Sequence, residues 1–175
     1  MDTSTTRPEE IPVVILAGGR GTRLMEETHL VPKPMVTIAG KPILYHIIRR
    51  YSAFGFKEFI ICLGYKGNVI KEYFSNLRMH VADMVVDVGG GVCDYLAPQT
   101  TDWTIKLIET GDNSLTGTRV YRVRNHIDAP HFCLTYGDGL SDIPLDEVLA
   151  FHLAHGRTGT VCAVHPPSRF GNLDV

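Results

Sequence analysis

The sequence predicts an α/β fold with a mostly parallel sheet, and two observations support this prediction. Apolar runs recur along the chain and are continuous rather than alternating, as expected for strands covered on both faces. These runs occupy residues 13–17, 59–64, 132–136 and 160–164. Helical patterns separate several of them, and alternation of strand and helix is typical of this fold class. In such sheets, ligands bind beyond the carboxyl ends of the strands.

Three helices are predicted. Residues 42–55 place their apolar side chains on one helical face, with Pro42 suited to the first turn and Gly55 to the end. Residues 69–77 predict a shorter helix. Residues 144–155 predict a third, because their apolar side chains share one side and a glycine follows directly.

The middle of the chain is less regular. It predicts two strands and two loops, at residues 84–88, 103–109, 89–91 and 98–102. No internal repeat or linker is evident. We therefore expect residues 11–175 to form one domain behind a loose polar tail at residues 1–10.

Composition narrows the class of protein. Hydrophobic residues make up 44% and charged residues 21% of the 175 residues, which is typical of a globular domain with a sizeable core. The net charge of −2 gives no support for nucleic acid or membrane binding, and no apolar stretch approaches the roughly 20 residues that span a bilayer. Cys62, Cys133 and Cys162 lie in apolar runs, so we expect core thiols in a reducing cytoplasm.

The most informative segment follows the first strand. It contains three glycines, a hydroxyl side chain and a guanidinium, namely Gly18, Gly19, Gly21, Thr22 and Arg23. The glycines let the backbone approach a ligand and turn its N–H groups inward, and such concavities bind phosphates. The arginine suits bidentate phosphate contacts, and Lys33 is held between two prolines. Together they predict a polyphosphate site at the carboxyl end of the first strand.

Other phosphate-binding loops fit this segment poorly. The chain has no Gly-Lys-Ser or Gly-Lys-Thr of a Walker A loop, and Leu24 stands where a dinucleotide fingerprint counted from Gly19 needs its third glycine. The plainer interpretation is an ordinary glycine-rich turn between a strand and a helix. Thr22, Arg23 and the Pro-Lys-Pro step weigh against that interpretation.

Asp138 is the candidate metal ligand. It lies between two glycines directly after the run at 132–136, and therefore at the carboxyl end of another strand. Magnesium in proteins takes one or two carboxylates together with phosphate oxygens. The alternative is a turn aspartate that bonds to its own backbone. A polyphosphate loop on the same sheet edge favours the metal role.

Residues 110–119 form a loop rich in hydroxyl side chains, which Arg119 closes. Such a loop can offer hydrogen bonds to a base and a cation to a phosphate. It can equally be a solvent-exposed loop that caps a following helix at 120–126, with Arg119 in a local salt bridge. The residues by themselves leave both interpretations open.

Residues 16–24 together with Lys33-Pro34 resemble the signature of the sugar-nucleotide pyrophosphorylases, and residues 136–139 resemble the metal-aspartate segment of that family. The similarity is specific to its glucose-1-phosphate cytidylyltransferase branch. It extends to residues 59–67, 112–119 and 166–174, and covers about residues 12–175.

The resemblance implies a Rossmann-like three-layer α/β fold with a mixed, mostly parallel sheet. It also implies a reaction in which CTP and glucose 1-phosphate give CDP-glucose and pyrophosphate with the help of Mg²⁺. The same resemblance implies a homo-oligomer, and the reduced thiols point to the cytoplasm.

Site residues carry over by the same resemblance. Contacts to base and ribose are expected from Leu16, Ala17, Gly18 and Gly19. The triphosphate is expected at Gly21, Thr22 and Arg23, with Lys33 touching the phosphates. Arg23 and Lys33 would stabilise the departing pyrophosphate. Ser114 and Arg119 would complete the nucleotide site, and Asp138 would bind the metal.

Members of this family continue past the segment that resembles residues 166–174, and bring a Glu-Lys-Pro lysine and a second aspartate that this chain lacks. We therefore expect a domain truncated at its C-terminus. Two alternatives stay open. One is a related enzyme that uses UTP, dTTP or ATP, and the other is a non-catalytic nucleotide-binding fragment.

Overall fold

The computed structural model describes residues 6–19, 31–96 and 102–164. The chain divides into two compact units, one within Asp2–Ser141 and one that contains the residues from Asp142 onward. Within the described residues, no helix combines the length and apolar character needed to cross a membrane.

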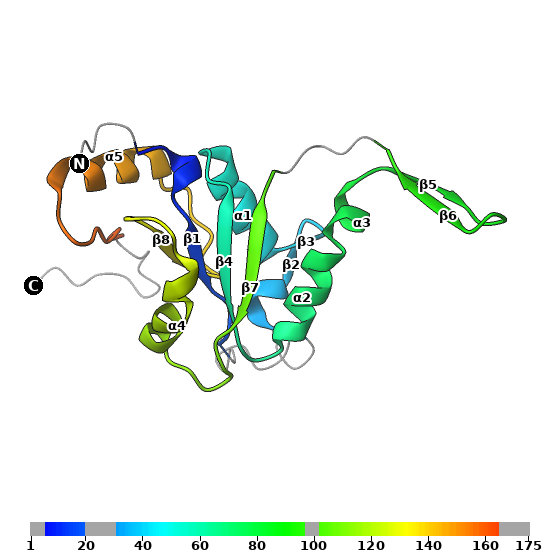
Figure 1. Cartoon of the computed structure of the whole chain (residues 1–175), viewed down its shortest axis with the longest axis horizontal. Helices are drawn as coiled ribbons and strands as arrows, with labels where there is room; N and C mark the ends of the chain where they lie inside the picture. The colour runs from blue at the N-terminus through cyan, green and yellow to red at the C-terminus, as the bar shows by residue number, and fades with distance from the viewer. Residues whose placement is uncertain (1–5, 20–30, 97–101, 165–175) are drawn as a thin grey trace, which may run out of the picture. The chain divides into compact units, whose positions relative to one another are not determined.

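A four-stranded sheet forms the centre of the first unit, in the order β7-β4-β1-β8 (Figure 1). Its strands are β1 (Val13–Leu16), β4 (Glu58–Leu63), β7 (Thr104–Glu109) and β8 (Cys133–Tyr136). All three strand pairs are parallel, which confirms the predicted α/β class with a largely parallel sheet. Antiparallel pairing among the described residues occurs in two separate two-stranded sheets.

Strands β1 and β4 form the buried centre of this sheet. Every residue of β1 is buried, as are the last five residues of β4. Their continuous apolar runs suit this position, because helices cover both faces. The register sets Leu16 beside Cys62 on one side and beside Tyr136 on the other. The carboxyl ends of β1, β4 and β8 therefore reach the same edge of the sheet.

The two faces of the sheet have separate cores. On one face, Val14, Leu16, Ile60 and Cys62 pack with Val123 of α4 (Thr116–Val123). On the other face, apolar side chains of α1 (Ile43–Ala53) are buried. There the ring of Trp103 contacts Phe59 of β4 and Tyr45 of α1, with ring centroids 6.2 and 5.7 Å apart.

The remaining elements of this unit are short. A hairpin of β2 (Thr37–Ile38) and β3 (Lys41–Pro42) precedes α1, whose observed bounds agree with the predicted helix. The predicted helix at 69–77 corresponds to α2 (Gly67–Ser75), and a further short helix that was not predicted, α3 (Leu77–Val81), follows it. One-turn 3-10 helices occupy Lys33–Met35 and Arg124–His126, besides one near the N-terminus.

A second hairpin consists of β5 (Met84–Asp87) and β6 (Val92–Tyr95), around the predicted glycine turn (Figure 1). The sequence predicts β5, whereas β6 was not predicted. The hairpin exposes apolar side chains, and Val88 is 89% exposed. Because neither face of β6 is buried, its sequence lacks the apolar pattern that identifies a strand. The predicted loop at 98–102 lies almost entirely outside the described residues.

The second unit contains α5 (Leu145–His155), which confirms the predicted helix. Gly156 ends it with a left-handed φ of 62°, a conformation that glycine adopts without strain. The strand predicted at 160–164 is wrong: these residues form no strand, and Val161 is 90% exposed. Cys162 is likewise exposed and is not a core thiol, and Cys133 is only partly buried, whereas Cys62 is buried as predicted. An apolar run becomes a strand only where a neighbour completes its hydrogen bonds.

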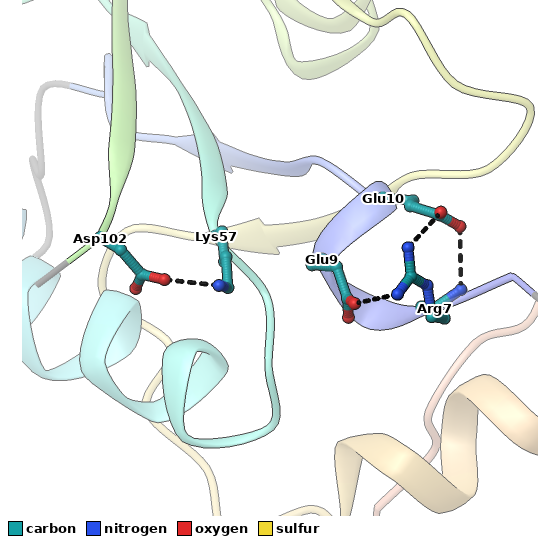
Figure 2. Close-up of polar contacts among 5 residues, drawn as sticks. All are labelled: Arg7, Glu9, Glu10, Lys57 and Asp102. Carbon is teal, nitrogen blue, oxygen red and sulfur yellow. Dashed lines mark hydrogen bonds and ion pairs between the residues drawn. The ribbon is translucent and has the colours of Figure 1, made fainter.

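The last residues of the predicted tail form a 3-10 helix at Pro8–Glu10. The Glu10 carboxylate accepts hydrogen bonds from the Arg7 backbone N–H and from its guanidinium, at 3.2 and 3.1 Å (Figure 2). These contacts give the turn a capping box. The chain is therefore folded in the structure before residue 11, at least from Arg7.

Candidate functional site

The backbone after β1 reaches the shared carboxyl edge of the sheet. Leu16 and Ala17 are buried, at 8% and 1% exposure, so their side chains belong to the core. Gly18 is buried, and Gly19 is exposed. Any contact to a ligand from this segment therefore comes from main-chain groups. The predicted phosphate residues Gly21, Thr22 and Arg23 lie outside the described residues.

Two hydrogen bonds hold the Gly18 carbonyl. It accepts from the Tyr65 backbone N–H at 3.3 Å and from Nη2 of Arg119 at 2.9 Å. No described residue accepts a hydrogen bond from the N–H of Gly19. The Gly18 carbonyl is thus held by two hydrogen bonds, whereas the Gly19 N–H bonds to no described residue.

Lys33 and Asp138 meet at this edge, where the lysine ammonium forms an ion pair with a carboxylate oxygen of the aspartate. Both side chains are partly accessible, at 36% and 29% exposure. The 3-10 helix that starts at Lys33 packs closely on the turn after β8, because a Cβ at Gly137 would lie 3.0 Å from Cγ of Pro34. The Gly137 N–H also donates to the Leu16 carbonyl at 2.9 Å, which ties this turn to β1.

Arg119 lies inside α4 rather than at the end of a loop, because the helix begins at Thr116 and not at residue 120. Its side chain is only 5% exposed. Nη1 donates to the Leu63 carbonyl at 2.9 Å and to Oγ1 of Thr110 at 2.7 Å. Nη2 donates to Gly18, as above, and to the Asp112 carbonyl at 3.4 Å. The predicted local salt bridge is absent among the described residues, since these four acceptors are uncharged oxygens.

The predicted roles of Ser114 and Arg119 in nucleotide binding stay predictions. The geometry favours an indirect role for Arg119, because four of its N–H groups already bond to protein oxygens. Ser114 is partly accessible, and its Oγ accepts a hydrogen bond from Nη1 of Arg122 at 2.9 Å. That leaves its hydroxyl hydrogen available to another group.

Two further residues belong to this network: Thr110, which the sequence placed in the hydroxyl-rich loop without a role of its own, and Arg122, which it did not identify. Thr110 is fully buried and donates from its hydroxyl to the Leu63 carbonyl at 2.6 Å. Arg122 donates to the Thr110 carbonyl at 2.6 Å and so links α4 to the end of β7. The position of Thr110 directly after a strand was a usable signal. The role of Arg122 depends on the orientation of α4 and had no signal in the sequence.

Burial shifts the pKa values of two neighbouring residues, Cys62 and Arg119. Burial raises the pKa of the Cys62 thiol to about 11, an effect that the nearby Arg119 guanidinium opposes. Burial also lowers the pKa of Arg119, with the charges of Cys62 and Asp112 acting in the opposite direction. Cys62 is therefore a neutral core thiol at physiological pH.

Asp138 is the candidate metal ligand that the sequence predicts at this edge. Within the described ranges, no three His, Cys, Asp or Glu side chains gather to form a complete protein metal site. One accessible carboxylate suits Mg²⁺ only when phosphate oxygens and water supply the other ligands. The donor set thus fits a metal that arrives with a polyphosphate.

The arrangement combines an exposed backbone amide, an accessible ammonium and an accessible carboxylate at the carboxyl edge of a parallel sheet. The amide and the ammonium can bind phosphate oxygens, and the carboxylate can bind a cation that the phosphates share.

The model of one protein family, described as nucleotidyl transferase, matches residues 12–175. The chain is 49% identical over 163 residues to a glucose-1-phosphate cytidylyltransferase of Salmonella typhimurium, which is 93% of this chain and 63% of that enzyme. It is 31% identical over 160 residues to a mannose-1-phosphate guanyltransferase of Gibberella zeae, covering 90% of this chain and 39% of that protein.

Among solved structures, HddC from Yersinia pseudotuberculosis complexed with GMP-PN matches with a TM-score of 0.59 and 27% identity, over 82% of this chain and 54% of that chain. The chain thus spans about 63% of the cytidylyltransferase that it matches.

Proposed function

The chain belongs to the nucleotidyl transferase family, and we propose that this protein transfers the cytidylyl group of CTP to glucose 1-phosphate, giving CDP-glucose and pyrophosphate. The observation that carries the proposal is the ion pair of Lys33 and Asp138 at the carboxyl edge of the sheet, where the turn before Asp138 bonds to Leu16 at the end of β1. The 49% identity to a glucose-1-phosphate cytidylyltransferase supports the choice of substrates.

The reaction needs no nucleophile from the protein. A phosphate oxygen of glucose 1-phosphate attacks the α-phosphorus of CTP, an oxygen–phosphorus bond forms, and the bond to the β-phosphate oxygen breaks. The electron pair of that bond leaves with pyrophosphate. Because two anions must approach each other, the protein contributes mainly positioning and positive charge.

Each site residue has a proposed part in this reaction. The main chain at 16–19 would contact the base and ribose, and Gly21, Thr22 and Arg23 would bind the triphosphate. Lys33 would exchange the Asp138 carboxylate for a phosphate oxygen when the nucleotide binds. Ser114 would offer its free hydroxyl hydrogen to the nucleotide.

Nucleotidyltransferases of this family generally use a divalent metal, and we propose Mg²⁺ here. When bound, this ion neutralises phosphate charge and weakens the bond to the departing pyrophosphate. Asp138 would hold it, once Lys33 has turned to the phosphates.

The test is pyrophosphate release by the complete protein from CTP and glucose 1-phosphate, with CDP-glucose identified by mass spectrometry. Turnover with CTP that clearly exceeds turnover with UTP, dTTP, ATP or GTP supports the proposal. The Arg23→Ala variant is expected to lose roughly a hundredfold in turnover, the effect of removing one positive charge from the transition state. An Arg23→Ala enzyme with unchanged turnover would remove this residue from the mechanism.

A second candidate is guanylyl transfer to mannose 1-phosphate. It has support from the mannose-1-phosphate guanyltransferase relatives and from HddC, a structure determined with GMP-PN. The higher identity to the cytidylyltransferase, 49% against 31%, favours cytidine. Higher turnover with GTP and mannose 1-phosphate would replace the first proposal by this one.

A non-catalytic nucleotide-binding role is the third outcome of the same assay. Tight calorimetric binding of CTP without pyrophosphate release would indicate it. The homo-oligomeric state and the cytoplasmic location stay predictions, and gel filtration with light scattering tests the first of them.

A further inference from the structure

We propose that His152, His155 and Thr160 form a pH-sensitive latch in the second compact unit. The latch holds the segment 156–160 on the last turn of α5 while both histidines are neutral, and it releases this segment when they are protonated. The proposal goes beyond the proposed function and does not depend on it, because the latch involves neither a nucleotide nor any residue assigned to the reaction.

Both histidine rings reach one hydroxyl group. Oγ1 of Thr160 lies 2.9 Å from Nδ1 of His152 and 2.7 Å from Nε2 of His155. The two histidines belong to the last turn of α5, and their spacing of three residues places them on the same side of the helix. Gly156 ends the helix in the left-handed conformation, which lets the chain change direction there. The segment 156–160 therefore folds back onto the end of α5.

The backbone fixes which nitrogen of His155 carries a hydrogen. Nδ1 of His155 accepts a hydrogen bond from the Arg157 N–H at 2.9 Å, so this nitrogen has no hydrogen of its own. A neutral imidazole carries its hydrogen on one nitrogen, and here that nitrogen is Nε2, which donates to Oγ1 of Thr160. The Thr160 hydroxyl keeps its own hydrogen, and Nδ1 of His152 is the acceptor within reach. The three bonds thus run in one direction, from Arg157 through His155 and Thr160 to His152.

A second proton on either ring disrupts this series. On His155 it would occupy Nδ1, and two N–H groups would then face each other where Arg157 now donates. On His152 it would turn Nδ1 from an acceptor into a donor, and the Thr160 hydroxyl would lose its acceptor. With both rings protonated, two positive charges with ring centroids 5.4 Å apart would repel each other. Because histidine changes its charge between about pH 5 and 8, these events fall within an accessible pH range.

The surrounding charges bear on the same equilibrium. Besides the histidines, the charged side chains in the described part of this unit are Asp142, Asp146, Glu147 and Arg157. Asp146 and Glu147 lie in the first turn of α5, at the end opposite the histidines, and Asp142 precedes the helix. The carbonyl end of the helix favours positive charge on the histidines. Arg157, two residues after His155, opposes it and adds to the repulsion that protonation creates.

Nitrogen-15 NMR of the histidine rings in the full chain tests the assignment without any variant. At about pH 8, both His152 and His155 should have their hydrogen on Nε2, because Nδ1 accepts a hydrogen bond in each ring. As the pH falls to about 5, the amide signals of residues 156–160 should move together with both ring signals. A hydrogen on Nδ1 of either ring at the higher pH, or amide signals that do not follow the rings, would overturn the proposal.

Hydrogen exchange of the Arg157 amide measures the release of the segment. Its protection, corrected for the intrinsic exchange rate at each pH, should fall about tenfold between about pH 8 and pH 5, the effect of losing one hydrogen bond. Thr160→Val removes the shared hydroxyl, so protection should already be low at the higher pH and should change less than half as much. Thr158→Val is the matched control at an exposed position of the same segment, and it should behave as wild type.

Two outcomes of the exchange experiment contradict the latch. One is constant protection of the Arg157 amide in wild type over the whole pH range. The other is a fall of equal size in wild type and in Thr160→Val, which would show that the hydroxyl does not couple the two rings. If Thr160→Val does not fold, the ring and amide titrations of wild type decide the question alone. No measurement uses CTP, so failure of the latch and failure of the proposed function are separate results.

Discussion

Two cations flank the end of β1, and the protein treats them differently. Arg119 is 5% exposed and bonds to four protein oxygens. Lys33 is 36% exposed and has one ion pair, with the Asp138 carboxylate, which is also the candidate metal ligand. Residue type and loop position suggested a phosphate contact for both. The number of bonds and the accessible surface separate them: the guanidinium is enclosed by protein oxygens, whereas the ammonium stays partly accessible.

The largest expected effect tests the accessible side of this comparison. Lys33→Ala should reduce turnover by roughly a hundredfold, because the departing pyrophosphate loses a stabilising positive charge. The melting temperature should change little, since partly exposed ion pairs contribute little to stability. Enzyme kinetics and thermal unfolding measure the two effects. Lys57→Ala is the matched control, because this lysine pairs with Asp102 far from the described site edge (Figure 2). Unchanged turnover in Lys33→Ala would remove the lysine from the reaction.

The next effect tests the buried side. Thr110→Val keeps the shape of the side chain but removes the hydroxyl that donates to Leu63 and accepts from Arg119, at 2.6 and 2.7 Å. We expect a loss of about 2 kcal/mol in the free energy of unfolding, because a buried donor loses its acceptor. Urea denaturation measures the loss. Thr104→Val, at an exposed position of β7, the strand that Thr110 follows, is the control and should cost much less. Equal losses for the two variants would contradict the importance of the buried network.

A third prediction uses Cys62, which lies beside Arg119 on the buried side. Burial raises the pKa of its thiol from 9.0 to about 11. The unfolded chain therefore loses this proton at lower pH than the folded chain. The contribution to stability is complete below pH 9 and is lost as pH rises toward 11.

The measurement is the free energy of unfolding of wild type and Cys62→Ala between pH 8 and about pH 11. The wild-type curve should fall more steeply, and the difference between the two curves isolates the thiol from other groups. Mass spectrometry after alkylation at pH 8 should also find Cys93 and Cys162 modified before Cys62, since both are exposed. Parallel stability curves, or early modification of Cys62, would show that this side is open to water.

The smallest expected effect comes from exposed ion pairs away from the described site edge. Hydrogen bonds to Arg7 lower the pKa of Glu10 below 4.5, and a hydrogen bond to Lys57 lowers the pKa of Asp102 below 3.8 (Figure 2). A lowered carboxylate pKa stabilises the folded state at higher pH, and this contribution is lost as pH falls through the folded-state pKa. Glu10→Gln and Asp102→Asn should slightly flatten the acid limb of the stability curve. A large change in the free energy of unfolding of either variant at acid pH would mean that exposed ion pairs contribute more to stability than expected.

The sequence by itself determined the local parts of this protein. Continuous apolar runs predicted β1, β4 and β8, helical spacing predicted α1 and α5, and glycine with charged neighbours identified the loop after β1 and the turn at Asp138. These features depend on residues close together in the chain, and they can therefore be predicted from local sequence patterns. The same logic failed at 160–164, where an apolar run forms no strand.

The tertiary structure alone decided which of these parts meet. Parallel pairing of β1 with β8 brings Lys33 and Asp138 together across about a hundred residues, and no local pattern encodes that pairing. The start of α4 at Thr116 turns Arg119 inward, where three strand ends surround it with carbonyl and hydroxyl oxygens. Burial, which depends on every element around a side chain, separates a guanidinium enclosed by protein oxygens from an ammonium that stays partly accessible.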